Sequence, residues 1–255
     1  MSAIKIAVTN QKGGVGKTTT AVNVAFYLAK SGEKVLLIDF DPQGNATSGL
    51  GVGKTALSKS MVKVMDGSLT LADSIHKTKF KNLYLAPATQ ELANAEPGLA
   101  GQKDRFVRLA RAVMTVENDY DYIIIDAPPS LGLLTINALV ATKYVLLPVQ
   151  AEFYALEGLG QLLETMKLTR KINQSLDLLG VLVTMVDGRT TLAAQVYEEI
   201  KKHFPGKVFE TRIPRNVRLA EAPSHGLPVG AYDAISKGAR AYKAVTKELV
   251  ERVQR

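Results

Sequence analysis

The 255-residue sequence contains no cysteine and only three histidines. The absence of cysteine excludes disulfide bonds, thiolate metal sites, cysteine-held iron–sulfur clusters and cysteine nucleophiles. The histidines, His76, His203 and His225, are scattered along the chain, so they do not form the spacing of a metal site. Functions that depend on thiol or clustered-histidine chemistry are therefore excluded.

Other features are missing as well. No apolar run approaches the length of a membrane span, and the N-terminus lacks the charged, apolar and small-residue segments of a signal peptide. No Pro/Gly/Ser-rich linker, sustained charge run or internal repeat divides the chain. We therefore expect a soluble, cytoplasmic protein that folds as a single domain over residues 1–255.

The charge is positive and unevenly distributed. The formal net charge is +8; residues Thr184 to Arg255 hold 13 Lys and Arg against 8 Asp and Glu, a net of +5, and the first 183 residues hold the remaining +3. The C-terminal third is therefore the expected docking surface for a polyanion. From charge alone, an ordinary solvated basic surface is an equally good interpretation.

Short β-branched runs alternate with amphipathic helical stretches. Runs such as Val35–Ile38 and Ile123–Ile125 are wholly apolar, which is typical of strands buried on both faces of a parallel sheet. The pattern predicts an α/β fold with a doubly wound, mostly parallel sheet and helices on both faces, where ligands bind beyond the carboxyl ends of the strands. The expected strands are Lys5–Thr9, Lys34–Asp39, Leu83–Pro87, Tyr122–Asp126, Tyr144–Val149, Leu178–Thr184 and Val208–Ile213. The expected helices are Lys17–Ser31, Asp104–Glu117, Gly158–Ile172, Leu192–His203 and Ser236–Val253.

A glycine-rich loop follows the first expected strand and opens the first expected helix. Glycines let backbone N–H groups curl around phosphate oxygens, and the helix N-terminus adds partial positive charge. In such a loop Lys17 reaches the β- and γ-phosphates, and the Thr18 hydroxyl ligates Mg²⁺. We therefore expect the loop to bind ATP with Mg²⁺. Its predicted nucleotide-binding residues are Gly13, Gly14, Val15, Gly16, Lys17, Thr18 and Thr19.

The loop departs from the ordinary phosphate-loop pattern at its first position. Gln11 stands where that pattern has glycine, and a second lysine, Lys12, precedes the double glycine. This form resembles the deviant Walker A motif of the ParA/MinD superfamily of P-loop ATPases. The resemblance implies that Lys12 is a catalytic residue that crosses a dimer interface to the partner's nucleotide, where it stabilises charge as an arginine finger does.

Two further loops place carboxylates directly after strands. Asp39 and Asp41 follow the second expected strand, and Asp126 ends the fourth. Carboxylates in these places can order Mg²⁺-bound water or orient an attacking water. The resemblance implies that Asp41, in the first switch, is needed for hydrolysis and that Asp126, the Walker B aspartate in the second switch, serves the metal. For Asp39 a structural role is at least as good an interpretation.

Four other stretches resemble the chromosomal ParA group, often called Soj. They are Leu146–Glu152, Tyr154–Gly158, Val183–Thr190 and Ile213–Ser224. The resemblance implies DNA binding by Arg189 and Arg218, and it places Pro214, Arg215 and Asn216 in the loop that contacts adenine. The candidates for DNA binding on the last helix are Lys237, Arg240 and Lys243, each of which could equally be a solvated surface charge.

The resemblance also implies a function. Members of this group are DNA-segregating ATPases in which two ATP-bound subunits form a homodimer on nonspecific double-stranded DNA of the nucleoid. A ParB-type partner stimulates the hydrolysis that releases the dimer. Contacts to DNA phosphates do not read sequence and weaken steeply with salt. Because the first strand begins so near Met1, we do not expect an N-terminal operator-reading domain.

Three alternatives share part of this pattern. A ParA-like positioner of protein cargo would have the same site residues and differ only in its partner. A membrane-associated cell-division ATPase of the MinD type would need a bulky apolar C-terminal helix; Lys247–Arg255 has no Phe or Trp and two glutamates, so no membrane is expected. An electron-transfer ATPase would need cysteines. The lysine-rich segment Lys54–Asp66 departs from the family, and it could contact DNA or cap the fold.

Overall fold

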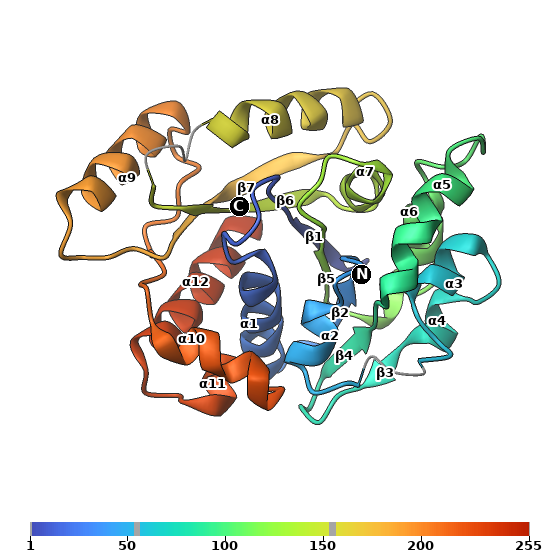
Figure 1. The fold of residues 1–255 in the computed structure, drawn as a ribbon, viewed down its shortest axis with the longest axis horizontal. Coiled ribbons are helices and arrows are strands. Elements are labelled where there is room, and N and C mark those ends of the chain that lie inside the picture. Colours follow the sequence, from blue (N-terminus) through green and yellow to red (C-terminus); the bar gives the residue numbers. More distant parts are fainter. Residues whose placement is uncertain (1, 54–56, 153–156, 255) are drawn as a thin grey trace.

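The computed structural model describes residues 2–53, 57–152 and 157–254. Within these residues the strands form one seven-stranded sheet in the order β3-β4-β2-β5-β1-β6-β7 (Figure 1). Only the short edge strand β3 pairs antiparallel. The strands are β1 (Ile4–Val8), β2 (Val35–Asp39), β3 (His76–Lys77), β4 (Leu83–Ala86), β5 (Tyr122–Asp126), β6 (Tyr144–Gln150) and β7 (Asp177–Thr184).

Helices cover both faces of the sheet. On one face lie α1 (Lys17–Lys30), α2 (Asn45–Gly49), α10 (Val217–Glu221), α11 (Val229–Tyr232) and α12 (Lys237–Val253). The other face carries α3 (Met61–Asp66), α4 (Leu71–Ser74), α5 (Ala95–Leu99), α6 (Arg108–Met114), α7 (Leu133–Val140), α8 (Glu157–Thr169) and α9 (Thr191–His203). Short 3-10 helices are η1 (Gln90–Asn94), η2 (Glu117–Asp119) and η4 (Ala222–His225).

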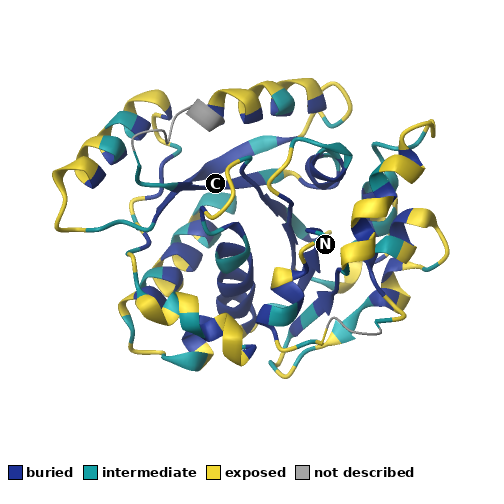
Figure 2. Cartoon of the chain, viewed as in Figure 1, coloured by how far each residue is buried: buried dark blue, intermediate teal, exposed yellow. Residues whose placement is uncertain are grey.

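The core is divided into two layers by the alternation of side chains along each strand. In β2, Leu36 and Ile38 pack among the helices of one face, whereas Val35 and Leu37 pack with α1 and α12 on the other. All five residues of β2 and of β5 are buried, because a central parallel strand has helices above and below it. Figure 2 shows the result as buried strands between helices whose outer sides are exposed.

The predicted doubly wound α/β fold is confirmed, as are six of the seven expected strands, whose ends shift by at most one residue. The expected strand at 208–213 is wrong: only isolated bridges join Val208 to Val181 of β7 and Pro214 to Val186, two residues beyond the end of β7. The N–H groups of Glu210 and Thr211 donate instead to the Glu248 carboxylate of α12, at 2.9 and 3.1 Å. Because the Glu248 side chain binds these N–H groups, the hydrogen-bonding ladder with β7 does not continue through them.

The other differences are local. The helix expected over 104–117 is shorter, as α6, because residues 104–107 form turns. Helices α2, α3, α4, α5, α7, α10 and α11 and strand β3 were not expected. Of the lysine-rich segment, residues 54–56 lie outside the described part, and α3 belongs to the buried core through Met61 and Met65. Residues 154–156 of the Soj-like stretch at 154–158 also lie outside the described part, and α8 begins directly after them.

Candidate functional site

The glycine-rich loop lies between the end of β1 and the start of α1. Gly14 and Gly16 have φ angles of 74° and 87°, a conformation that side chains with a Cβ rarely adopt. Gly16 is the N-cap of α1, and no side chain caps that helix end. The first-turn N–H groups, which include those of Thr18 and Thr19, therefore have no acceptor within the helix and are suited to bind an anion.

Two distant side chains hold the loop in place. Asn10 Nδ2 donates to the Pro148 carbonyl of β6 at 2.7 Å, and Thr184 Oγ1 at the end of β7 donates to the Val15 carbonyl at 2.9 Å. Both side chains are buried. Sequence analysis did not assign either residue a role, since their partners lie more than 130 residues away in the chain and no local pattern marks them.

The Lys17 side chain turns back over the loop. Its Nζ donates to the Lys12 carbonyl at 3.0 Å, and the residue is only 7% exposed. Burial lowers the pKa of Lys17, while the carboxylates of Asp126 and Asp41 oppose that shift. The structure thus brings together three of the residues predicted from sequence, a buried cation facing two carboxylates at the carboxyl edge of the sheet.

The Lys12 side chain is placed differently. Its backbone N–H donates to Asn10 Oδ1 at 3.0 Å, but its ammonium lies 2.7 Å from the carboxylate of Glu152. Both partners are more than two-fifths exposed, and Gln150 also donates to Glu152, at 2.5 Å. The Lys12 ammonium is therefore held at the surface of its own subunit, and Glu152 is a contact that sequence analysis did not identify.

Two buried carboxylates face each other across neighbouring strands. Asp39 ends β2 and Asp126 ends β5, and the two occupy the same register position. Asp39 accepts hydrogen bonds from the N–H and hydroxyl of Thr47, at 2.7 and 2.6 Å, and from the Asp41 N–H at 3.3 Å. Burial raises the pKa of Asp39, and these hydrogen bonds oppose the rise. Asp39 thus has the contacts of a structural carboxylate that fixes the turn before α2.

Asp126 has no comparable set of contacts. It is 1% exposed, and among the described residues neither of its oxygens has a hydrogen-bonding partner. Burial and the charge of Asp39 raise its pKa well above the ordinary value, and the nearby Thr18 and Lys17 side chains only partly offset this. Such buried orphan oxygens are rare in folded proteins. A divalent cation that uses oxygen ligands would satisfy them, so the residues present fit Mg²⁺.

Asp41 lies in the turn that follows β2. It is 6% exposed, its Oδ1 accepts from the Gln43 N–H at 2.9 Å, and its carbonyl accepts from the Gly44 N–H at 2.8 Å. These bonds close a tight turn immediately before α2, so Asp41 lies in a loop, as expected from Pro42. Within the described residues, no group of three or more His, Cys, Asp or Glu side chains has metal-binding geometry. A bound Mg²⁺ would then take most of its ligands from phosphate and water, which is its usual habit.

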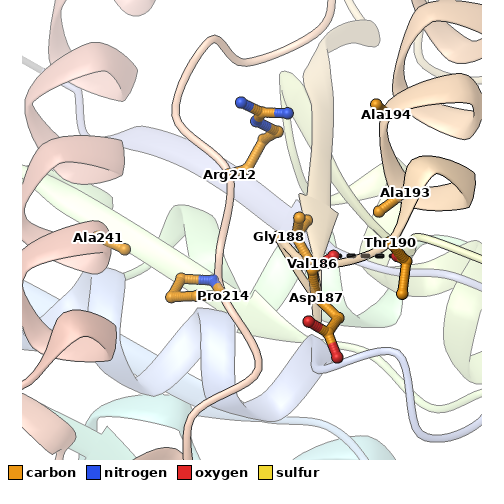
Figure 3. Close-up of a pocket in the computed structure, with 9 residues that line it drawn as sticks. All are labelled: Val186, Asp187, Gly188, Thr190, Ala193, Ala194, Arg212, Pro214 and Ala241. Atoms are coloured by element: carbon orange, nitrogen blue, oxygen red, sulfur yellow. Dashed lines mark hydrogen bonds between the residues drawn. The ribbon is translucent and has the colours of Figure 1, made fainter.

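The loop at 214–216 lies beside the end of β7. Val186 accepts a backbone hydrogen bond from Arg215 at 3.0 Å and donates one to Ile213 at 3.0 Å. Figure 3 shows Pro214 across a cavity of about 430 Å³ from Asp187 and Thr190. The Oδ1 atom of Asn216 is buried without a hydrogen-bonding partner among the described residues, so it is available to accept a bond from a ligand.

The basic residues predicted from sequence fall into two groups. Arg189 lies on the loop after β7 and Arg218 lies on α10, and the Val186–Arg215 hydrogen bond brings these two segments together. Each arginine pairs with at least one carboxylate of its own chain. The others lie on the exposed side of α12 or at its start. Leu219 packs against Gly238, which sets α10 directly over the first turn of α12. The α12 residues are Lys237, Arg240 and Lys243, and in the described part of the chain none of them has a carboxylate partner within 4.0 Å.

The apolar side of α12 is already occupied. Ala239, Tyr242, Val245 and Leu249 are buried against α1 and the sheet, and the Tyr242 hydroxyl lies 3.1 Å from the Thr20 hydroxyl of α1. The helix therefore packs against the protein with the face that a lipid-binding helix would insert. Across the described residues, none of the helices combines the length and the apolar character needed to cross a bilayer.

Comparisons with known proteins cover nearly the whole chain. A family model described as an AAA domain matches residues 3–178. The chain is 55% identical to the sporulation initiation inhibitor protein Soj of Bacillus subtilis, over 96% of this chain and 97% of that protein. It is 49% identical to the chromosome-partitioning ATPase Soj of Thermus thermophilus, over 98% of this chain and 96% of that protein. One similar crystal structure is described as cobyrinic acid a,c-diamide synthase from Mycobacterium smegmatis with a bound ATP analogue and magnesium. It superposes with a TM-score of 0.87 at 36% sequence identity, over 99% of this chain and 96% of that one.

Proposed function

Because this chain belongs to the Soj and ParA family of chromosome-partitioning ATPases, we propose that it segregates DNA by a cycle of ATP-dependent dimerisation. It is an ATPase that uses Mg²⁺. In this proposal residues 1–255 act as a single ATPase domain in the cytoplasm. Two ATP-bound copies bind nonspecific double-stranded DNA of the nucleoid, and a ParB-type protein stimulates the hydrolysis that releases them.

The glycine-rich loop binds the triphosphate. Backbone N–H groups from Gly13 to Thr19 surround its oxygens, and Lys17 exchanges its bond to the Lys12 carbonyl for the β- and γ-phosphates. The pKa of Lys17 is lowered by burial, and the neighbouring carboxylates of Asp126 and Asp41 oppose that shift. A buried ammonium has little competing water around it, so its attraction for phosphate is strong.

Asp126 and Thr18 would hold Mg²⁺, Thr18 by its hydroxyl and Asp126 directly or through a bound water. The ion would supply electrostatic stabilisation of the charge on the phosphoryl oxygens. Asp41 lies on the loop next to this position, and its second carboxylate oxygen is suited to orient the attacking water and to accept a proton from it. The single observation that best supports this assignment is the Asp126 carboxylate, which is buried beside Lys17 and has neither oxygen paired with any described residue.

Lys12 acts on the nucleotide of the second subunit. In this subunit its ammonium is paired with Glu152 at the surface instead of reaching the loop it belongs to. An exposed pair of this kind contributes little stability, typically about 0–1 kcal/mol. The pair can therefore open when a more highly charged phosphate of the partner approaches, and dimer formation completes both active sites.

The base and the DNA are bound by neighbouring loops. Pro214, Arg215 and Asn216 contact the adenine, where the unpaired Asn216 Oδ1 can accept a hydrogen bond from the exocyclic amino group. Arg189 and Arg218 contact DNA phosphates, together with the α12 residues Lys237, Arg240 and Lys243. A dimer presents two copies of this set, so its affinity for DNA greatly exceeds that of one subunit.

The proposal is tested by measuring DNA binding with ATP, with ADP and without nucleotide at two salt concentrations. We expect ATP alone to give tight binding, and salt to weaken it steeply. Lys17→Ala should abolish nucleotide binding, and Asp41→Ala should retain ATP and remain on DNA. Arg189→Glu should dimerise normally yet lose DNA. Equal DNA binding in ATP and ADP would refute the proposed cycle.

A further inference from the structure

Arg189 and Arg218, two of the residues assigned to DNA, are paired with carboxylates of their own chain. Arg189 lies with Asp187, and Arg218 lies with Glu221 and Asp233. These five side chains carry two positive and three negative charges, so the cluster that should attract DNA is not positive by itself. Its role therefore depends on how the carboxylates modify the arginines.

The Arg189 pair is bidentate. Nε and Nη2 of Arg189 donate to the two oxygens of Asp187, at 2.9 and 2.7 Å, and the Arg189 N–H donates to the same carboxylate at 3.1 Å. The Arg189 guanidinium holds the pKa of Asp187 well below its usual range. The Arg189 side chain is nevertheless 89% exposed. A DNA phosphate that approaches the Arg189 guanidinium therefore also approaches the negative charge of the Asp187 carboxylate.

Arg218 is paired twice. Its Nη1 lies 2.8 Å from Glu221 and its Nε lies 3.3 Å from Asp233. The Tyr232 hydroxyl donates to the same Glu221 oxygen at 3.3 Å and so helps to fix that carboxylate. The cations of α12 differ in this respect, since no carboxylate pairs with Lys237, Arg240 or Lys243 in the described part of the chain.

We propose that Asp187 and Glu221 are positioning residues that mask the charge of the DNA-binding arginines, so that a single subunit binds DNA too weakly to remain on it. The inference rests on the proposed DNA binding by Arg189 and Arg218. Each carboxylate holds its arginine in a fixed orientation and repels an approaching phosphate. Stable binding then requires the doubled set of contacts that two subunits supply.

The variant Asp187→Asn tests the negative charge of Asp187 separately from the hydrogen-bonded turn that this residue forms with Arg189. The amide oxygen can still accept the Arg189 N–H, so the turn is retained while the negative charge is lost. If one more phosphate contact becomes effective in each subunit, the dependence of log K on log salt steepens by about 0.9 per subunit, which at ~0.1 M salt corresponds to about eightfold tighter binding. Glu221→Gln removes the nearer of the two carboxylates at Arg218 and leaves Asp233 in place, so we expect a change in the same direction but a smaller one.

The matched control is Asp119→Asn, which removes one charge from the exposed end of η2. This residue lies just before the start of β5, at the amino ends of the parallel strands, whereas Arg189 follows the carboxyl end of β7. The assay is fluorescence anisotropy of a labelled duplex over a salt series, without nucleotide and with ATP, on variants whose thermal unfolding matches the wild type. We expect Asp187→Asn and Glu221→Gln to bind more tightly without nucleotide and with a steeper salt slope, and Asp119→Asn to match the wild type.

The outcomes separate the two ideas. Wild-type protein that fails to bind DNA with ATP would remove the proposed function and this inference together. Wild-type protein that binds with ATP, while both carboxylate variants behave like Asp119→Asn, would overturn the masking role alone. Weaker binding by Asp187→Asn and Glu221→Gln would also overturn it, since the carboxylates would then support the arginines without masking them.

Discussion

Replacing Asp126 with asparagine is expected to stabilise the protein alone and to weaken its response to Mg²⁺ and ATP. In the structure this carboxylate is 1% exposed, has no hydrogen-bonding partner among the residues that the structure describes, and faces Asp39 in the β2–β5 register. A buried polar group without a partner costs about 1–3 kcal/mol, and a charged group costs more. Asparagine removes the charge, and its amide can donate to Asp39. We therefore expect a gain of about 1–3 kcal/mol in the free energy of unfolding.

Thermal unfolding followed by circular dichroism measures both halves of this prediction. For a chain of this length about 1 kcal/mol shifts Tm by roughly 2–4 °C, so Asp126→Asn should unfold about 2–12 °C above the wild type in metal-free buffer without nucleotide. Adding ATP and Mg²⁺ stabilises the wild type by mass action. The variant should gain much less, since it has lost the carboxylate that we propose to hold the metal.

Asp39→Asn is the matched control, because it removes the same charge from the facing register position. The oxygens of Asp39 accept three hydrogen bonds, two of them from Thr47. An amide nitrogen there would oppose a donor, so this variant should lose stability by about 1–3 kcal/mol. The reasoning is refuted if the two variants shift Tm in the same direction, or if Asp126→Asn keeps the full response to Mg²⁺.

Three further predictions concern contacts between segments that are distant in the sequence. Thr184→Val leaves the Val15 carbonyl without its donor and should weaken nucleotide binding by about tenfold in a titration, which corresponds to about 1.4 kcal/mol. Tyr242→Phe removes the buried bond between α12 and α1 and should lower the free energy of unfolding by about 1 kcal/mol in urea. Gly226→Ala should be the most destabilising, because its Cβ would lie 2.6 Å from the Gly51 Cα at a φ of +62°; overpacking and the positive φ together should lower the free energy of unfolding by roughly 2–4 kcal/mol in the same assay.

The fold could be predicted because each strand carries its own signal. The residues of Val35–Asp39 and Tyr122–Asp126 are apolar up to a final aspartate, and both runs are strands with these bounds. The run at 208–213 has the composition of a strand, and the N–H groups of Phe209 and Ile213 donate to β7. The ladder is interrupted between them, where the carboxylate of Glu248 binds the N–H groups of Glu210 and Thr211. Composition reports that a segment can be extended, but it does not report what lies beside it.

Some residues of the candidate site could also be predicted from local sequence patterns, and others could not. The loop from Lys12 to Thr18 and the aspartates at strand ends follow local patterns, and the structure brings Lys17, Asp41 and Asp126 together as expected. Asn10, Thr184 and Glu152 act through partners more than 130 residues away. Their side chains are common ones with many possible uses, so only the folded topology shows what they contact. The roles assigned to the site residues remain predictions for the experiments above.

The position of β1 in the sheet has a consequence for synthesis of the chain. β1 is made first, yet its neighbours are β5 and β6, and the loop that follows it is fastened by Pro148 and Thr184. At about 5–20 residues per second, the ribosome takes on the order of ten seconds or more to supply these partners. During that time the first strand is unpaired and exposed to unwanted pairing with other chains. A nascent copy therefore cannot form the phosphate loop until most of the polypeptide has been made.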